Sequence, residues 1–254
     1  METIGLIAAM LQESRALLRC IKEWERTRIG PFRGAHFRIL ERDCRLITRG
    51  LGFERAMHGA RLLLAEAPPD LLVSFCIAGA VYADLRIGDV VVATHNYYLA
   101  KDSPAQVCPL AHLSKAAWDA ATQALQPTGA RLLAGTAVTT RGSQVAPKDM
   151  EGMENPVLEM ETAGIAQVAA GAGLPLVSIR SISDGPGAPI PVDLETIMDE
   201  NYNFRIGKML VMVLRRPQIL FQARQILRNS GTAADHAARA LLAALSQPSP
   251  FLSL

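Results

Sequence analysis

The sequence lacks the cysteine patterns that mark disulfide-stabilised or metal-binding proteins. Its four cysteines, Cys20, Cys44, Cys76 and Cys108, are far apart and form neither a CxxC pair nor a cluster with histidines. We therefore expect reduced thiols, as in a cytoplasmic protein, with no metal site and no disulfide framework.

The sequence also lacks an excess of charge of one sign. The formal net charge is +2, and the basic residues between positions 26 and 45 are interleaved with acidic and apolar ones. Nucleic-acid binding needs basic residues on one face without acidic neighbours, so we expect no nucleic-acid partner. No GxGxxG follows the first apolar run either, which disfavours a nicotinamide-dependent dehydrogenase.

Long hydrophobic runs are missing as well. The run Met209–Leu214 is much shorter than the roughly 20 residues that cross a bilayer. The apolar run Ile4–Met10 has no basic flank of the kind that signal peptides carry, so we interpret it as a first strand.

Short apolar runs rich in valine and isoleucine alternate with Ala/Leu/Arg segments that have helical periodicity. This alternation predicts an α/β protein with one sheet covered on both faces by helices. The segment Phe37–Thr48 predicts a hairpin, which makes the sheet mixed. The expected strands are Ile4–Ala9, Leu71–Phe75, Val90–Ala93, Gly135–Thr139 and Leu176–Ser181, and the expected helices are Gln12–Trp24, Ala56–Ala67, Ser114–Leu125 and Thr162–Gly171.

No internal linker is apparent, so we expect a single domain over residues 1–245 followed by a tail at 246–254. Residues from about 205 to 245 are expected to form a C-terminal helical extension.

Acidic residues follow the ends of the predicted strands, where ligands bind in open α/β sheets. Asp184 ends the last strand, and Glu13 follows the first. Each also has a structural explanation: Asp184 begins an Asp-Gly-Pro-Gly turn, while Glu13, Glu159 and Glu161 stand where helix N-termini favour acidic side chains.

Four blocks of sequence, in order, resemble the methylthioadenosine/adenosylhomocysteine nucleosidases of the nucleoside phosphorylase/nucleosidase superfamily. They are IGLIAAM at 4–10 with Glu13, Pro69-Asp70 with IAGA at 77–80 and LRIGDVVV at 85–92, LEMETAGIA at 158–166, and IRSISD at 179–184. The resemblance implies a single-domain three-layer nucleoside phosphorylase-like fold, with a central mixed sheet flanked by helices. It also implies cleavage of a purine nucleoside at its N-glycosidic bond without a cofactor.

The resemblance further implies a role for each acidic residue. Asp184 protonates the leaving purine, which requires a carboxyl group that keeps its proton near neutral pH. Glu161 accepts hydrogen bonds from the ribose hydroxyls, Met160 packs on the ribose face, and Glu13 orients and deprotonates water. Ser183 is expected to support Asp184.

Further residues of the family pattern are expected to line the substrate site. Arg180 either supports Asp184 or forms a surface ion pair, and Phe75 is either a base-stacking residue or a core residue. The other expected lining residues are Glu159, Ile77, Ala78, Gly79, Ser143, Gln144 and Val145.

Two departures from the family pattern bear on the nucleophile. Ile77 stands where the family has a serine, and Ser74 stands where phosphorylases have a phosphate-binding arginine. Losing both favours water over phosphate, although Arg15 or Arg49 is a candidate substitute for phosphate binding. Ile77 also leaves open a non-catalytic nucleoside-binding protein.

The turn around Ile77 resembles futalosine hydrolases and hopanoid-associated phosphorylases, and the segment from Leu214 to Leu220 resembles the tail of the second group. That likeness implies, as an alternative, a phosphorylase acting on a lipid-linked adenosyl nucleoside. The apolar segments Met209–Leu214 and Ile219–Leu227 carry interspersed basic residues and are separated by Pro217. They either contact a membrane surface peripherally or close the core or a subunit interface. The family also implies a homodimer or higher homo-oligomer.

Overall fold

A computed structural model describes residues 2–100, 103–140, 147–187 and 218–252. The strands are β1 (Glu2–Ala8), β2 (Glu25–Ile29), β3 (Phe32–Ile39), β4 (Arg42–Thr48), β5 (Leu71–Ala80), β6 (Val90–Ala100), β7 (Ser103–Gln106), β8 (His112–Leu113), β9 (Leu132–Thr140), β10 (Pro156–Glu159), β11 (Leu176–Asp184) and β12 (Phe251–Leu252). The α-helices are α1 (Leu11–Arg19), α2 (Phe53–Glu66), α3 (Lys115–Leu125), α4 (Thr162–Gly171) and α7 (Gln218–Leu245).

Most strands join one mixed sheet, as the sequence predicts. Within the described residues its order is β10-β9-β6-β11-β5-β1-β4-β3-β2, with β7 on β6. The central strands β4, β1, β5 and β11 are parallel, whereas β3 and β4 form the expected antiparallel hairpin. Strand β10 pairs with both β9 and β5, so one half of the sheet curls back on itself.

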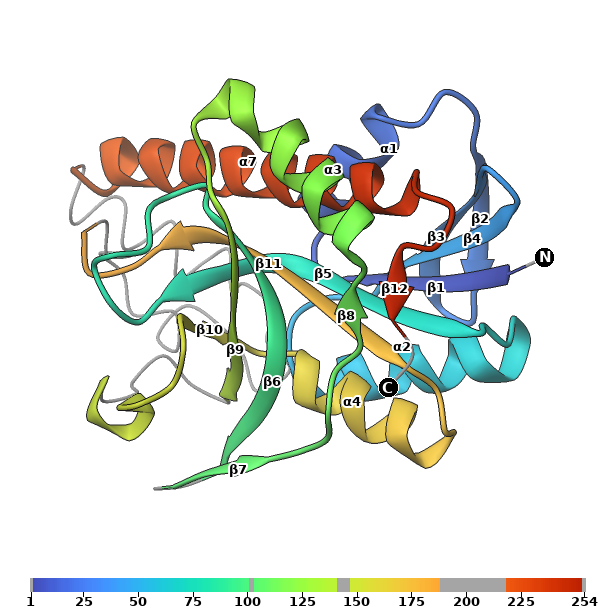
Figure 1. Cartoon of the computed structure of the whole chain (residues 1–254), viewed down its shortest axis with the longest axis horizontal. Coiled ribbons are helices and arrows are strands. Elements are labelled where there is room, and N and C mark those ends of the chain that lie inside the picture. The colour runs from blue at the N-terminus through green and yellow to red at the C-terminus, as the bar shows by residue number, and fades with distance from the viewer. Residues whose placement is uncertain (1, 101–102, 141–146, 188–217, 253–254) are drawn as a thin grey trace.

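Helices cover both faces of this sheet, giving three layers (Figure 1). Helices α1, α3 and α7 lie together on one face, and α2 and α4 pack against each other on the opposite face. Each face has its own apolar cluster, because side chains alternate along a strand and the central strands are apolar on both sides. The predicted fold class is confirmed.

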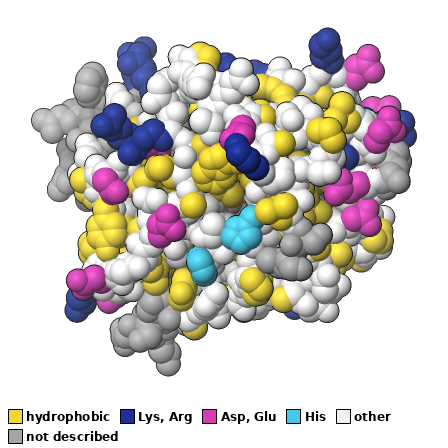
Figure 2. Space-filling view, viewed as in Figure 1, with side chains coloured by type: hydrophobic (Ala, Val, Ile, Leu, Met, Phe, Trp, Pro, Cys, Tyr) yellow, Lys and Arg dark blue, Asp and Glu magenta, His cyan; other side chains and the backbone are white. Residues whose placement is uncertain are grey.

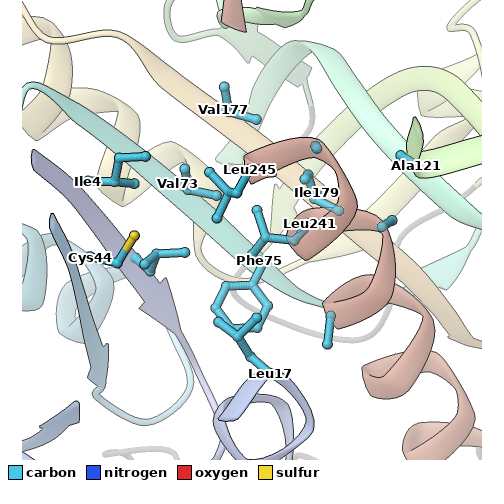
Figure 3. Close-up of a cluster of buried hydrophobic side chains, with 14 of the residues drawn as sticks. Ile4, Leu17, Cys44, Val73, Phe75, Ala121, Val177, Ile179, Leu241 and Leu245 are labelled. Atoms are coloured by element: carbon cyan, nitrogen blue, oxygen red, sulfur yellow. The ribbon is translucent and has the colours of Figure 1, made fainter. Parts of the chain in front are cut away.

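Phe75 lies in the middle of the core beneath α1 and α7 (Figure 3). Its side chain is fully buried and belongs to the same apolar cluster as Leu17 and Leu241. Of its two expected roles, the core position is therefore the one that the fold provides, and base stacking by Phe75 is wrong.

Strands β5, β6, β9 and β11 all run further than the sequence predicts. The small residues Cys76–Ala80 remain in β5, because Cys76 and Ala78 still pair with β11 and Gly79 also pairs with β10. Likewise β11 continues to Asp184. Pairing between strands overrides the turn preference of small residues.

Helix α1 ends earlier than predicted, at Arg19 rather than near Trp24. The chain must leave the helix in time to enter β2 at Glu25, whose strand pairs with β3. Trp24 is left 38% exposed.

The described part of the predicted C-terminal extension is the single long helix α7, which packs on α1, α3, β5 and β11. Its buried alanines, among them Ala234, Ala237 and Ala238, let it approach the sheet closely. Met209–Leu214 and Pro217 lie outside the described residues, so the arrangement of the extension stays a prediction. No helix among the described residues is long and apolar enough to cross a membrane. On the face seen in Figure 2, basic and acidic side chains are interspersed.

Candidate active site

Glu13 lies at the start of α1 and connects this helix to β5. One carboxylate oxygen, Oε2, accepts hydrogen bonds from the backbone amides of Ala9 (2.9 Å) and Met10 (2.8 Å). The other oxygen, Oε1, accepts a hydrogen bond from the amide of Ile77 on β5, at 3.1 Å. The first pair is the helix-start role that the sequence allowed, and the bond to Ile77 brings the same carboxylate to the end of the central strand.

Burial dominates the ionisation of Glu13. Desolvation of the nearly inaccessible side chain raises its pKa to about 7, although the amides of Met10 and Ile77 favour the charged form. The negative charge of Glu161 raises the pKa further. Glu13 can therefore gain or lose a proton near neutral pH, as a general base requires.

Asp184 reaches the same region from β11. The register between β11 and β5 shifts between Ile182 and Asp184, and such a bulge re-aims the side chains next to it. The carboxylate then lies over Gly79, where an added Cβ would be 2.8 Å from Oδ2. A larger residue at position 79 would displace it.

Burial also raises the pKa of Asp184, and the hydrogen bond from the Ser183 hydroxyl, at 2.6 Å, only partly offsets this effect. Ser183 thus contacts Asp184 as the sequence predicts. A raised pKa favours the protonated carboxyl group that a general acid needs.

Glu161 is held between two elements at the N-terminus of α4. Its Oε1 accepts a hydrogen bond from the Gly52 amide at 2.9 Å, and its Oε2 accepts one from the Cys76 thiol at 3.4 Å. The side chain is 2% exposed. Because both oxygens are engaged, the carboxylate has one fixed orientation.

The three acids therefore converge on the carboxyl end of β5. Ile77 contacts Glu13, Cys76 contacts Glu161, and Gly79 lies against Asp184. The acids come from three segments far apart in the chain, so their meeting is a product of the fold.

Glu159 and Arg180 form a separate buried ion pair. Arg180 Nη2 lies 3.1 Å from Glu159 Oε2, and Arg180 also bonds the hydroxyls of Ser74 and Thr162, both at 2.6 Å. Arg180 is fully buried and its hydrogen bonds go to Ser74, Glu159, Thr162 and the Ile179 carbonyl rather than to Asp184, so both of its expected roles, as a support for Asp184 and as a surface residue, are wrong.

Both carboxylate oxygens of Glu159 accept hydrogen bonds within the same network. Besides Arg180, it accepts hydrogen bonds from the amides of Glu161 (3.0 Å) and Thr162 (2.7 Å) and from the Thr139 hydroxyl. Burial alone would raise the pKa of Glu159, but Arg180 and these donors lower it below its ordinary value. We therefore assign Glu159 to the support of helix α4 and no longer expect it to bind substrate.

The remaining expected lining residues fall into two groups. Met160, Ile77 and Gly79 are partly exposed beside the three acids, whereas Ala78 is buried. Ser143, Gln144 and Val145 lie outside the described residues.

Two contacts of the site were not anticipated from the sequence. Gly52 donates to Glu161, and its φ of 103°, like the φ of 90° at Gly50, is a conformation that favours glycine. The Gly-Leu-Gly spacing directly before a helix was the available signal. Nothing in the sequence marked Cys76 as a donor to Glu161.

The candidate phosphate ligands are dispersed. Arg15 is exposed on α1, whereas Arg49 is buried near Glu161. The Ser74 hydroxyl is already bonded to Arg180. Among the described residues, no group of three His, Cys, Asp or Glu side chains is arranged to hold a metal ion.

Known proteins with similar sequences belong to one family. The model of the phosphorylase superfamily matches residues 3–208. The chain is 30% identical over 197 residues to a 5′-methylthioadenosine/S-adenosylhomocysteine nucleosidase of Maridesulfovibrio salexigens, covering 71% of this chain and 85% of the relative. It is 27% identical over 209 residues to the enzyme of the same name from Haemophilus influenzae, covering 77% and 91%.

Solved structures share the fold. The nucleosidase of that name from Colwellia psychrerythraea, in complex with adenine, superposes with a TM-score of 0.70 at 19% identity, covering 98% of this chain and 96% of the other. Futalosine hydrolase of Helicobacter pylori superposes with a TM-score of 0.67 at 16% identity, covering 95% and 96%.

Proposed function

Because the chain belongs to the phosphorylase superfamily, we propose that it is a nucleosidase that cleaves the N-glycosidic bond of a 5′-substituted adenosine-type nucleoside and releases the base. The observation that carries the proposal is the meeting of Glu13, Glu161 and Asp184 at the carboxyl end of β5. The names of the curated relatives support the same substrate class.

The chemistry requires a leaving base that is neutralised and a sugar cation that is stabilised. Asp184 donates a proton to the purine, because burial raises its pKa and its carboxyl group lies over Gly79 without a cationic partner among the described residues. Glu161, fixed by Gly52 and Cys76, accepts hydrogen bonds from the ribose hydroxyls, and its charge favours the sugar cation. Met160 packs on the ribose face.

Glu13 activates the nucleophile. Its pKa of about 7 lets it take a proton from water at neutral pH, and its three backbone hydrogen bonds fix where that proton is accepted. Water is favoured over phosphate because Ile77 has no polar side chain and the Ser74 hydroxyl is bonded to Arg180.

Phosphate remains the second candidate nucleophile, which would make the chain a glycosyltransferase acting on a lipid-linked adenosyl nucleoside. The buried, cationic Arg49 beside Glu161 is the observation that favours it. A non-catalytic nucleoside-binding relative is the third reading, because Ile77 departs from the family pattern.

Further parts of the proposal concern the surroundings of the protein. The chain works in the cytoplasm as a homodimer or higher homo-oligomer, with peripheral membrane contact through its C-terminal segment. Support for such a contact comes from α7, where Leu227 is 65% exposed between the exposed Arg224 and Arg228.

One incubation tests the proposed reaction. The protein is mixed with methylthioadenosine, adenosylhomocysteine or adenosine, with and without phosphate, and the base and sugar products are separated. Adenine with free sugar in the absence of phosphate supports the hydrolase, and adenine with a sugar phosphate only in the presence of phosphate supports the phosphorylase. If no base appears with any substrate under either condition, the proposed function is wrong.

A further inference from the structure

Arg49 is a buried cation at the end of β4 whose environment the proposed mechanism does not explain. Its side chain is 3% exposed, its Nε has no hydrogen-bond partner, and no described carboxylate lies within ion-pair distance of it. Burying a charged group is costly unless it is paired and hydrogen-bonded. The negative charge of Glu161 favours the charged form of the Arg49 guanidinium.

The guanidinium holds the turn between β4 and α2. Its Nη1 donates to the carbonyl oxygens of Gly50 (2.8 Å) and Gly52 (3.3 Å). The peptide group between these two carries the Gly52 amide. This amide donates a hydrogen bond to Glu161 Oε1 at 2.9 Å. Arg49 thus fixes the peptide groups on either side of the one that orients Glu161.

Helix α2 leaves room for this arrangement. Gly59 faces the aliphatic part of Arg49, and a Cβ at position 59 would lie 2.8 Å from Arg49 Cδ and 3.5 Å from its Cβ. Alanine is the better helix former, so the glycine gives up helix stability at a place where the arginine needs the space.

We infer that Arg49 is a positioning residue: it holds the Gly50–Gly52 turn so that the Gly52 amide and its own charge keep Glu161 oriented toward the sugar hydroxyls. This inference rests on the proposed function, because it assigns Arg49 to the sugar contact of that reaction. It differs from a phosphate-binding role, since the anion that Arg49 serves is the protein's own carboxylate.

The test compares adenosine with 2′-deoxyadenosine. Dissociation constants are measured by calorimetry in an Asp184→Asn background, where we expect binding without turnover, and steady-state kinetics are measured in the otherwise unchanged protein. Arg49→Met keeps the aliphatic stem but removes the charge and the donors. It should weaken adenosine binding roughly tenfold or more, the usual range for losing a hydrogen bond to a charged group, and weaken 2′-deoxyadenosine binding clearly less.

Three further variants make the result specific. Arg49→Lys keeps the charge and should restore part of the affinity, whereas Gly59→Ala should reproduce the loss through crowding alone. Glu161→Gln should abolish the effect of Arg49→Met, because both act on the same contact. Arg38→Met removes an exposed arginine on β3 and should change nothing.

The outcomes separate the two proposals. If the protein releases no base but Arg49→Met still weakens adenosine more than 2′-deoxyadenosine, the proposed function fails and the role of Arg49 stands. If Arg49→Met weakens both ligands equally, leaves both unchanged, or adds its full effect to that of Glu161→Gln, the role of Arg49 is overturned. Loss of phosphate-dependent turnover alone, with unchanged nucleoside affinity, would also overturn it and assign Arg49 to phosphate instead.

Discussion

Glu159 and Glu13 are similarly buried at the same end of the sheet, 5% and 1% exposed, yet their pKa values move in opposite directions. Glu159 faces Arg180 and several hydrogen-bond donors, and its pKa falls. Glu13 has only backbone amides and a thiol as donors and the negative Glu161 nearby, and its pKa rises to about 7. The pKa of Asp184, which accepts a hydrogen bond from the Ser183 hydroxyl, is also raised.

This difference in pKa distinguishes a carboxylate that supports the fold, Glu159, from the carboxyl groups proposed for catalysis, Glu13 and Asp184. A buried carboxylate with a cationic partner stays charged and holds elements together, whereas burial without such a partner raised the pKa of Glu13 and Asp184 and favours their protonated forms. Replacing a carboxylate that has a cationic partner should therefore lower stability, whereas replacing one without a cationic partner should lower activity.

The largest effect is expected at Asp184. Asp184→Asn keeps the size of the side chain but removes the acidic proton, so kcat should fall by about 10²–10⁴-fold while nucleoside affinity changes little. Steady-state kinetics with methylthioadenosine and calorimetric binding measure the two quantities. Asp119→Asn, an exposed position on α3, is the matched control and should leave both unchanged. Retained turnover in Asp184→Asn would remove Asp184 from the mechanism.

The buried ion pair should respond through stability instead. Arg180→Met leaves Glu159 charged and unpaired in the core, which typically costs about 3–5 kcal/mol of the free energy of unfolding. Urea unfolding monitored by circular dichroism measures this loss.

A second variant checks its cause. Arg180→Met combined with Glu159→Gln removes both charges and should recover part of the lost stability. A single-variant loss below about 1 kcal/mol would show that the pair is not the support we describe.

The effect of replacing Glu161 should fall between these two cases, because its carboxylate is fixed like that of Glu159 but is proposed to bind the sugar hydroxyls. Glu161→Gln replaces an acceptor-only group, so one position facing Gly52 or Cys76 becomes a donor. KM should rise about 10–100-fold with a smaller fall in kcat, consistent with losing hydrogen bonds to a charged group. An unchanged KM for the ribonucleoside would contradict the sugar contact.

A separate effect is the pH dependence of stability that Glu13 causes. Burial raises its pKa from 4.5 to about 7, so the folded chain holds this proton more tightly than the unfolded chain. Glu13 therefore contributes stability that is fully present below pH 4.5 and is lost as the pH rises through about 7. The slope is at most about 1.4 kcal/mol per pH unit for one proton.

Comparison with Glu13→Gln isolates this contribution. The unfolding free energy of the wild type minus that of the variant should decline between pH 4.5 and 7 and then level off. A difference that is constant over this window would mean that Glu13 has an ordinary pKa. Since the proposed mechanism needs an ionised Glu13 together with a protonated Asp184, kcat/KM should follow a bell-shaped pH profile whose two apparent pKa values belong to the pair of acids.

The residues proposed for this site came from blocks of sequence that resemble a nucleosidase family, and they also stand in simple local patterns. Asp184 closes an apolar strand, Glu13 opens a helix, and Ser183 precedes the acid that it contacts. The errors came from residues whose partners are distant in sequence. Arg180 was expected either to support Asp184 or to form a surface ion pair, whereas it bonds Ser74 and Glu159 in the core.

The predicted ends of the strands were wrong for the same reason: their partners are distant in the sequence. Cys76–Ala80 looks like a turn of small residues, but pairing with β11 and β10 keeps it in the sheet. Gly52 was missed for a similar reason, because its amide donates to Glu161, which lies 109 positions away in the sequence.

The α/β class and the central strands and helices could be predicted from the sequence, because apolar periodicity is a local property of the chain, and the three acids proposed for the site came from ordered blocks that resemble a nucleosidase family. Only the tertiary structure decided which buried acid has a cation beside it and which has none. That outcome depends on strands β5, β10 and β11 meeting in space, and a carboxylate takes its pKa from what surrounds it there.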